Sequence, residues 1–338
     1  MIDEFLMIRR IEEILREGGA AGRDGTVEVP IGDDAAAIRL GGGRRLLATT
    51  DALVQGVHFD PAAEDPEDLG YRAVASNVSD VCAMGGAPRW TLASLVLPPA
   101  TAADWVDRFA RGFAEGARTA GVSVVGGNLS AGAQIVVSVT MLGKMSTTPL
   151  RRSGARPGDG LYLTGLVGAA AAARSALRGG VAATPEHRML DRRRARPPMR
   201  IEAARVLGQV ASAAIDVSDG LAQDLSHLLT ASGVSALIDL AAVPLAFGHP
   251  RDRDGPVLGL ALSGGEDYEL VAAIPPASER AAGRLMAEAG VSLYRFGEVT
   301  AQGPAGAVRV VGEGGGGLPL DRAGYRHFCS LTSGNGGS

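Results

Sequence analysis

The chain is poor in the residues that bind metals through sulfur or nitrogen. Its 338 residues include two cysteines and five histidines. The cysteines, Cys82 and Cys329, do not have the spacing of a zinc site or of a disulfide framework, and the motif HExxH is absent. These absences argue against zinc chemistry. They fit a reducing compartment, so we expect a cytoplasmic protein.

Three further absences narrow the class of protein. No apolar run reaches the roughly 20 residues that cross a bilayer, and the charged start of the chain does not resemble a secretion signal. The formal net charge of -4 argues against non-specific binding of nucleic acid. The phosphate-binding motif GxxxxGK[ST] is missing. A GxGxxG match over 312–317 does not open a helix, so we interpret it as a flexible turn. We therefore expect a soluble protein with no membrane or nucleic-acid partner.

Glycine and hydrophobic residues, in contrast, are abundant. The sequence has 48 glycines and is 46% hydrophobic. A chain of this length exceeds the roughly 250–300 residues that one core supports, which predicts two domains. Strand and helix patterns alternate along the chain, so we expect an α/β (α+β) fold. The polar stretch 144–160, rich in Pro and Gly, places the boundary: domain 1–147, domain 148–330 and a flexible tail 331–338.

Residues 31–59 contain the first acidic corner. A Gly-Asp-Asp turn is followed by a strand-like run that we expect to end on Asp51. Asp33, Asp34 and Asp51 would then converge at one end of a hairpin. Carboxylates packed together repel one another unless a cation lies between them. The alternative is an ordinary hairpin turn, in which Asp and Gly are common.

Similar acidic corners recur four more times, at the ends of expected strands and helices. The candidate residues are Asp33, Asp34, Thr49, Thr50, Asp51, Asp80, Asp219, Asp224, Glu266 and Asp267. Oxygen ligands without His or Cys partners favour hard cations such as Mg²⁺. Several Mg²⁺ ions held by carboxylates would suit phosphoryl transfer, which depends on positioning and charge neutralisation. Each corner also has an ordinary explanation, such as a helix N-cap or a solvated helix face.

Two other segments carry expectations. Residues 126–130, Gly-Gly-Asn-Leu-Ser, read as a turn between strands over 122–125 and 134–142. The basic block 187–200 reads as a solvated helix end, with contact to phosphate or to an acidic surface as the alternative.

Taken together, the motifs resemble those of the thiamine-monophosphate kinase family, in the superfamily of aminoimidazole ribonucleotide synthetase. They occur in the family's order and cover nearly the whole chain. Three of them, GVHF, SGGEDYEL and the terminal GYxHF, distinguish the kinases from their relatives. The matching stretches are IGDDAA (31–36), TTDALVQGVHF (49–59), NVSDVCAMGGAP (77–88), GGNLS (126–130), RSGARPGD (152–159), RPPMRI (196–201), DVSDGLAQDL (216–225), LSGGEDYEL (262–270) and GYRHF (324–328).

The resemblance implies two domains, each a mixed β-sheet flanked by helices, and ATP-dependent phosphorylation of thiamine monophosphate to thiamine diphosphate. It also implies several Mg²⁺ ions and a homodimer paired through the N-terminal domains, with ATP bound near that interface. The implied metal ligands are Asp34, Thr49, Thr50, Asp51, Asp80, Asn128, Asp219 and Asp224. The implied catalytic set is Asp51, Asp80 and Asp219. The implied ATP contacts are Gly127, Asn128 and Arg152. The implied substrate contacts are His58, Glu266 and Tyr325, with Tyr325 stacking on a thiamine ring.

One residue departs from the family pattern. Asn128 stands where the family has Asp, and an amide oxygen is a weaker Mg²⁺ ligand than a carboxylate. Two alternative interpretations stay open. In the first, the chain is another ATP-dependent enzyme of the superfamily, of the aminoimidazole ribonucleotide synthetase or selenide water dikinase type. In the second, which Asn128 supports, the chain binds a nucleotide without turnover. The reactive N-terminal cysteine of the selenium enzyme is not seen, since the first cysteine is Cys82.

Overall fold

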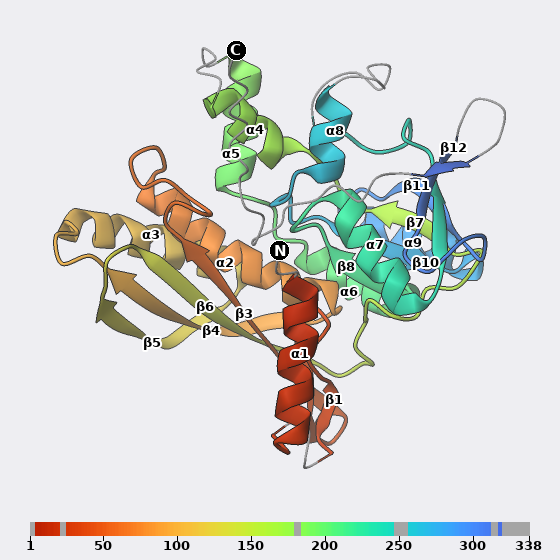
Figure 1. The fold of residues 1–338 in the computed structure, drawn as a ribbon, viewed down its shortest axis with the longest axis horizontal. Helices are drawn as coiled ribbons and strands as arrows, with labels where there is room; N and C mark the ends of the chain where they lie inside the picture. Colours follow the sequence, from red (N-terminus) through yellow and green to blue (C-terminus); the bar gives the residue numbers. More distant parts are fainter. Residues whose placement is uncertain (1–3, 21–24, 179–183, 247–255, 312–316, 320–338) are drawn as a thin grey trace, which may run out of the picture.

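The structure is a computed structural model that describes residues 4–20, 25–178, 184–246, 256–311 and 317–319. Two β-sheets lie side by side, each with helices packed against it (Figure 1). The expected α/β fold with two mixed sheets flanked by helices is confirmed. Within the described residues, no helix combines the length and the apolar character needed to cross a membrane.

The first sheet has six strands in the order β1-β2-β3-β6-β4-β5. Neighbouring strands pair antiparallel, except that β4 and β5 run parallel. The elements of this half are α1 (Glu4–Glu17), β1 (Val27–Val29), β2 (Ala36–Gly41), β3 (Arg44–Val54), α2 (Pro66–Ala83), β4 (Ala87–Leu97), α3 (Ala103–Ala120), β5 (Ser123–Ala131) and β6 (Val136–Met145).

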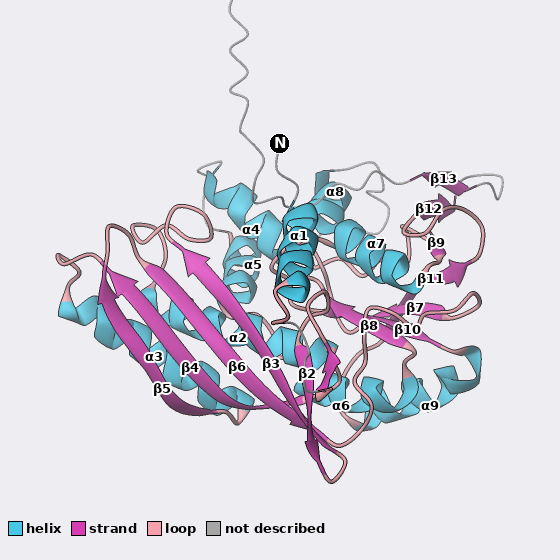
Figure 2. Cartoon of the chain, turned by 60° about the horizontal axis from the view of Figure 1, so that its bottom comes forward, coloured by secondary structure: helices cyan, strands magenta, loops and turns pink. Residues whose placement is uncertain are grey.

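Helices α2 and α3 cover one face of this sheet, and β5 forms its outer edge (Figure 2). Helix α2 begins where the Asp65 side chain accepts a hydrogen bond from the Glu67 N–H, with Pro66 in the first turn. The two helices approach closely because glycines lie at their crossing. A Cβ atom on Gly112 would come within 1.7 Å of the carbonyl oxygen of Glu67.

The second sheet has seven strands in the order β13-β12-β9-β11-β7-β10-β8. Most neighbours pair antiparallel, and β12 runs parallel to β9. The elements of this half are β7 (Gly160–Leu163), α4 (Ala169–Arg178), α5 (Pro185–Ala195), α6 (Ile201–Val210), β8 (Ala213–Asp216), α7 (Leu221–Ser232), β9 (Ser235–Ile238), α8 (Pro256–Ser263), β10 (Leu270–Ile274), α9 (Pro276–Glu288), β11 (Tyr294–Thr300), β12 (Val308–Val311) and β13 (Gly317–Pro319).

The larger hydrophobic core is shared by both halves of the chain. Buried residues of α6, such as Val206 and Leu207, join a continuous apolar cluster with Val78 of α2 and Leu47 of β3. A second cluster packs α7 against the other face of the second sheet. The two sheets are therefore held together by packed side chains as well as by the connecting chain.

Three local expectations are wrong. Strand β3 does not end on Asp51 but continues to Val54. Residues 126–130 are not a turn, because they pair with β4 as part of the parallel strand β5. The basic block 187–200 is not a solvated helix end: several of its arginines pair with acidic residues, which was the alternative. Helix α8 was not predicted. The tail 331–338 and most of the glycine-rich segment 312–317 lie outside the described residues.

Candidate active site

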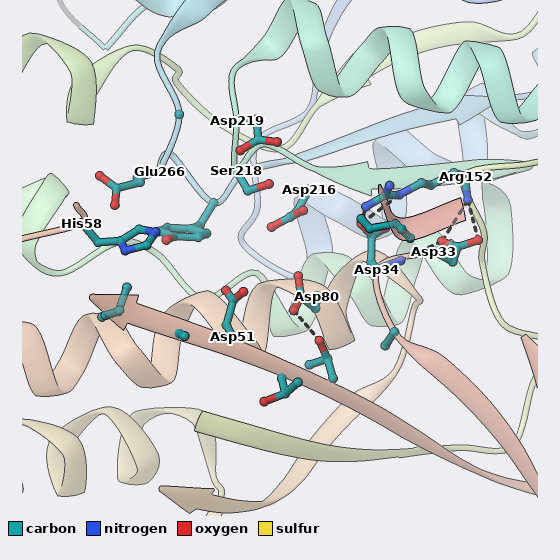
Figure 3. Close-up of a pocket in the computed structure, with 18 of the residues that line it drawn as sticks. Asp33, Asp34, Asp51, His58, Asp80, Arg152, Asp216, Ser218, Asp219 and Glu266 are labelled. Carbon is teal, nitrogen blue, oxygen red and sulfur yellow. Dashed lines mark hydrogen bonds and ion pairs between the residues drawn. The ribbon is translucent and has the colours of Figure 1, made fainter. Parts of the chain in front are cut away.

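A cleft of about 1210 Å³ lies between the two halves of the chain. Strand β3 and helix α2 form one wall (Figure 3). The opposite wall comes from the end of β8 and from the loop 263–268. Residues far apart in the sequence therefore face one another across the cleft. The predicted site residues that line it are Asp33, Asp34, Thr49, Thr50, Asp51, His58, Asp80, Arg152, Asp219 and Glu266.

Three carboxylates meet in the cleft: Asp34, Asp80 and Asp216, here called the acidic cluster. Their ligand oxygens all lie within 4.8 Å of one another. Asp34 precedes β2, Asp80 lies in the last turn of α2, and Asp216 is the final residue of β8. The cluster thus combines elements of both halves, which the close packing of α2 against β8 makes possible.

The electrostatics of the cluster fit a cation. Burial, together with the charge of Asp34, raises the pKa of Asp216 to about 8. Burial and the charges of Asp51, Asp216 and Asp34 raise the pKa of Asp80 well above its ordinary value. Oδ2 of Asp34 is buried and has no hydrogen-bond partner. Closely spaced oxygen ligands that repel one another and leave an acceptor unsatisfied match the preference of Mg²⁺ for carboxylates.

Arg152 is the cation that the chain itself supplies to this region. Its Nη2 lies 2.6 Å and its Nε 3.2 Å from Oδ1 of Asp34. Its backbone N–H donates to the carboxylate of Asp33. Burial and the charge of Asp34 raise the pKa of Asp33 to about 6. Arg152 therefore partly neutralises the cluster, and its own place is fixed by two neighbouring aspartates.

Strand periodicity separates the adjacent residues Thr49, Thr50 and Asp51. Successive side chains of a strand point to opposite faces. Thr49 faces α2, where its hydroxyl donates to Asp80 at 2.7 Å, and Asp51 shares that face of the strand. The hydroxyl of Thr50 instead donates to the carbonyl of Val139 at 3.0 Å. The structure brings Thr49 and Asp51 to the acidic cluster and turns the Thr50 side chain away from it.

Asp219 and Asp224 lie in different environments. Asp219 lines the cleft beside Ser218, after the end of β8 (Figure 3). Asp224 is buried under that turn, and its Oδ2 accepts hydrogen bonds from the backbone N–H groups of Ser218, Asp219 and Gly220 at 3.0 to 3.1 Å. Asp224 is not among the residues that line the cleft. Its carboxylate holds the turn that carries Asp219.

His58 and Glu266 occupy the part of the cleft away from Arg152 (Figure 3). The backbone N–H of Val54 donates to Nδ1 of His58 at 3.0 Å, so a neutral His58 ring carries its proton on Nε2. Glu266 forms an ion pair with Arg174 of α4. The loop that carries Glu266 is strained, because Glu266 and Tyr268 have φ values of 68° and 51°. Such backbone strain in residues other than glycine is typical of functional sites.

Two residues that were predicted to contact ATP are not brought to the cleft either. Gly127 and Asn128 lie on β5, and β6 and β4 separate that strand from β3. The Asn128 side chain donates to the Ser130 hydroxyl at 3.0 Å. Tyr325 lies outside the described residues.

Three residues that line the cleft were not predicted from the sequence: Asp216, Ser218 and Tyr268. Asp216 ends a short buried strand and stands three positions before Asp219. A carboxylate that closes a buried strand, next to an acidic turn, was the available signal. Tyr268 directly follows the acidic pair Glu266-Asp267, and no feature of its sequence context distinguishes it from a core aromatic residue.

Comparisons with known proteins identify the family of the chain. The family model "AIR synthase related protein, N-terminal domain" matches residues 32–145, and the corresponding C-terminal model matches 156–309. Thiamine-monophosphate kinase of Salmonella typhimurium is 36% identical over 336 residues, covering 97% of this chain and 98% of the relative. The Escherichia coli K12 enzyme of the same name is 37% identical over 334 residues. The chain belongs to the thiamine-monophosphate kinase family.

Solved structures of this kinase family share the fold. AaThiL complexed with AMPPCP and TMP superimposes with a TM-score of 0.81 at 31% identity, covering 96% of this chain and 97% of that one. The enzyme of Stenotrophomonas maltophilia gives a TM-score of 0.72 at 34% identity, covering 91% and 96%. Hydrogenase maturation protein HypE in complex with ATP, at 23% identity and a TM-score of 0.69, shares the fold alone.

Proposed function

We propose that the chain transfers the γ-phosphoryl group of ATP to thiamine monophosphate, giving thiamine diphosphate and ADP. The observation that carries this proposal is the acidic cluster, which joins both halves of the chain at the floor of one cleft with Asp51 and Asp219 beside it. The family supports the choice of substrates, because a relative of the same fold binds AMPPCP and TMP.

Asp34, Asp80 and Asp216 would hold Mg²⁺, and Asp51 and Asp219, which line the same cleft, are the further acidic residues available to the ions and phosphates. When bound, Mg²⁺ would neutralise the charge that develops on the transferring phosphoryl group. The hydrogen bond from Thr49 favours the ionised form of Asp80 and so opposes part of the rise in its pKa that burial and the neighbouring carboxylates cause. Arg152 holds Asp34 and supplies a guanidinium at the same end of the cleft, where a nucleotide phosphate would lie.

The chain need not supply a strong general base. The nucleophile is a phosphate oxygen of thiamine monophosphate, which is already anionic near neutral pH. The part of the cleft with His58 and Glu266 suits the organic part of the substrate. Glu266 offers a carboxylate to the positively charged thiamine, and His58 can donate from Nε2. Catalysis then depends on holding two anionic groups in line.

We also propose a cytoplasmic homodimer. Strand β5 is exposed along its whole length, with Val124, Val125 and Leu129 between 51% and 67% exposed. An exposed edge strand with apolar side chains is a surface that proteins usually cover. Pairing of two first sheets through β5 would bury it. It would also explain how Gly127 and Asn128, remote from the cleft of their own chain, could reach a nucleotide at the interface.

The deciding experiment incubates the protein with ATP, Mg²⁺ and thiamine monophosphate and measures thiamine diphosphate by fluorescence after oxidation to thiochrome. We expect product that depends on Mg²⁺ and disappears with EDTA. The Asp51→Ala variant should lose turnover while keeping its fold, whereas Asp104→Asn, an exposed change on α3, should retain it. ATP binding without product at saturating Mg²⁺ would contradict the proposal and favour a binding protein. ADP release with another superfamily substrate alone would reassign the reaction.

A further inference from the structure

The basic block 187–200, which contains most of α5, links the two halves of the chain. The proposed reaction does not explain why these arginines are present. Arg196 pairs with Asp68 of α2 at 2.6 Å and with Glu115 of α3 at 2.7 Å. Arg200 reaches back to Glu269, which is fully buried beside the cleft loop, with Nε at 2.6 Å from the carboxylate. The segment therefore crosses from the second half of the chain to the first.

Arg194 differs from its neighbours because it is buried and because its contacts connect it with residues at the cleft. It is 5% exposed, and its Nη1 lies 2.8 Å from Oε2 of Glu64. The same oxygen of Glu64 lies 2.9 Å from Nη2 of Arg72. Arg72 is completely buried, and its Nη2 also donates to the backbone carbonyl of His58 at 3.3 Å. A chain of contacts thus runs from Arg194 through Glu64 and Arg72 to His58.

The position of the Arg72 side chain depends on this series of contacts. Its Nε and Nη1 have no hydrogen-bond partner, and Glu64 is the acidic group with which it forms an ion pair. A buried charge that loses its counter-ion is strongly destabilised. Glu64 is itself partly exposed, with 14% of its side chain accessible, and Arg194 is the second arginine, beside Arg72, that holds its carboxylate. Loss of Arg194 would let Glu64 turn to solvent and leave Arg72 without an anchor.

His58 lies in a short backbone turn, residues 54–59, that Arg72 contacts. A displacement of Arg72 would therefore move the imidazole ring of His58. The N–H of His58 donates to the carbonyl of Val54 at 2.9 Å, and the N–H of Val54 donates to the His58 ring at 3.0 Å. The N–H of Gly56 donates to Phe59 at 2.8 Å. Arg72 is bound to the carbonyl of the same short turn. The orientation of the imidazole is therefore coupled to the position of Arg72.

We propose that Arg194 is a positioning residue for thiamine monophosphate, acting through Glu64 and Arg72 to fix the turn that presents His58 to the cleft. This inference rests on the proposed function, since it takes His58 as a contact of that substrate. Arg194 itself does not line the cleft. Its effect should therefore appear in the binding of one substrate and not of the other, because ATP is assigned to the opposite end, near Arg152.

The test compares Arg194→Gln with Arg196→Gln in the full chain. The control removes the ion pairs with Asp68 and Glu115 from the same segment but leaves the route to His58 intact. We expect Arg194→Gln to raise KM for thiamine monophosphate by about tenfold, with KM for ATP and kcat within about twofold. Arg196→Gln should leave both KM values within about twofold. Arg194→Lys, which keeps the charge, should recover part of the loss.

A double-mutant cycle and hydrogen exchange identify the route. Glu64→Gln should reproduce the KM effect, and the double variant should be no worse than either single variant because both remove one connection. Amide exchange over 54–60 should accelerate in Arg194→Gln, while the rest of the chain keeps its protection. Equal changes in both KM values, uniform loss of protection, or an unchanged KM for thiamine monophosphate would overturn the inference. An inactive wild-type chain would instead refute the proposed function.

Discussion

Single residues of the acidic cluster place unfavourable charge inside the folded protein. The carboxylate oxygens of Asp34, Asp80 and Asp216 lie within 4.8 Å of one another, and burial raises the pKa of each side chain. The folded chain without metal is therefore destabilised locally by the groups that its proposed chemistry needs. Replacement of one carboxylate by the nearly isosteric amide should separate stability from function.

The Asp216→Asn variant tests that separation. At pH 8 and without Mg²⁺ it should melt higher than the wild type, by a few degrees or about 1–2 kcal/mol, because one repelling charge is gone. The amide oxygen can still accept the hydrogen bond from Ser79. With Mg²⁺ the order should reverse, since the wild type gains more from the ion, and turnover should fall at least about 100-fold. Calorimetry with and without Mg²⁺ measures both effects. A melting temperature that is lower without metal would contradict this account of the cluster.

The same pKa shifts predict how stability depends on pH. The pKa of Asp33 is about 6 and that of Asp216 about 8 in the folded chain, against an ordinary value of 3.8. The folded state therefore binds more protons than the unfolded state between those limits. The free energy of unfolding of the metal-free protein should fall as pH rises from about 4 to about 8, by up to about 1.4 kcal/mol per pH unit for each carboxyl. Urea unfolding across that range measures it. Mg²⁺ should flatten the decline, because its affinity rises as the carboxyls lose their protons.

Asp224 allows a sharp test of two roles. If its three backbone hydrogen bonds define its role, Asp224→Ala should lower the free energy of unfolding by about 2–3 kcal/mol, since three N–H groups would lose their acceptor. Its Mg²⁺ affinity, measured by calorimetric titration, should stay within about threefold of the wild type. A large loss of Mg²⁺ affinity in a stable variant would restore the assignment of Asp224 as a metal ligand.

The sequence predicted much of the site at the residue scale. Asp33, Asp34 and Asp51 were expected to converge, and all three line the cleft. Thr50 was assigned as a metal ligand together with Thr49 because both belong to the same sequence motif. In a strand, however, the side chains of adjacent residues point to opposite faces. Asp216 was missed because residues 214–217 read as a short strand with Asp216 inside it, and the more obvious turn at Asp219 follows directly. Distances between carboxylates from four elements cannot be read from a linear pattern.

At the scale of elements, the crossing of α2 and α3 depends on the absence of two side chains. Cβ atoms on Gly112 and on Gly70 would lie 1.7 Å and 2.2 Å from backbone carbonyl oxygens of the opposite helix. Gly112→Ala should lower the free energy of unfolding by about 3 kcal/mol, although alanine favours helix formation. Gly283→Ala on α9 is the matched control. Nothing lies within 4 Å of its added methyl group, so it should be neutral or stabilising by up to about 1 kcal/mol. Equal effects in thermal denaturation would show that the helix crossing is not the cause.

Strand β5 shows where local reading fails. Gly-Gly-Asn at 126–128 is typical of a turn. In the folded chain these residues pair with Ala93 and its neighbours on β4, far away in sequence. The hydrogen bonds offered by β4 outweigh the local preference, and no window of a few residues contains that information. Helix α2 differs in this respect, because its N-terminal cap at Asp65 is a contact between residues close together in the sequence.

At the scale of the whole molecule, the exposed edge predicts association. Leu129 is 67% exposed on β5. Leu129→Lys should convert the proposed dimer to monomers in light scattering coupled to size-exclusion chromatography, because a charge replaces an apolar contact on an edge strand. Met189→Lys removes a similarly exposed apolar side chain from α5, away from the first sheet, and should leave the mass unchanged. A wild-type protein of monomeric mass would refute the dimer, and with it the proposed route by which Asn128 reaches the nucleotide.

The apolar cluster that α6 shares with α2 and β3 has a consequence for any attempt to divide the gene. Each half expressed alone would expose to water a large apolar surface that the other half covers in the intact protein. Such fragments should precipitate singly yet reassemble when produced together, and a protease cut in the connecting stretch 146–158 should leave a nicked protein that still melts in one cooperative step.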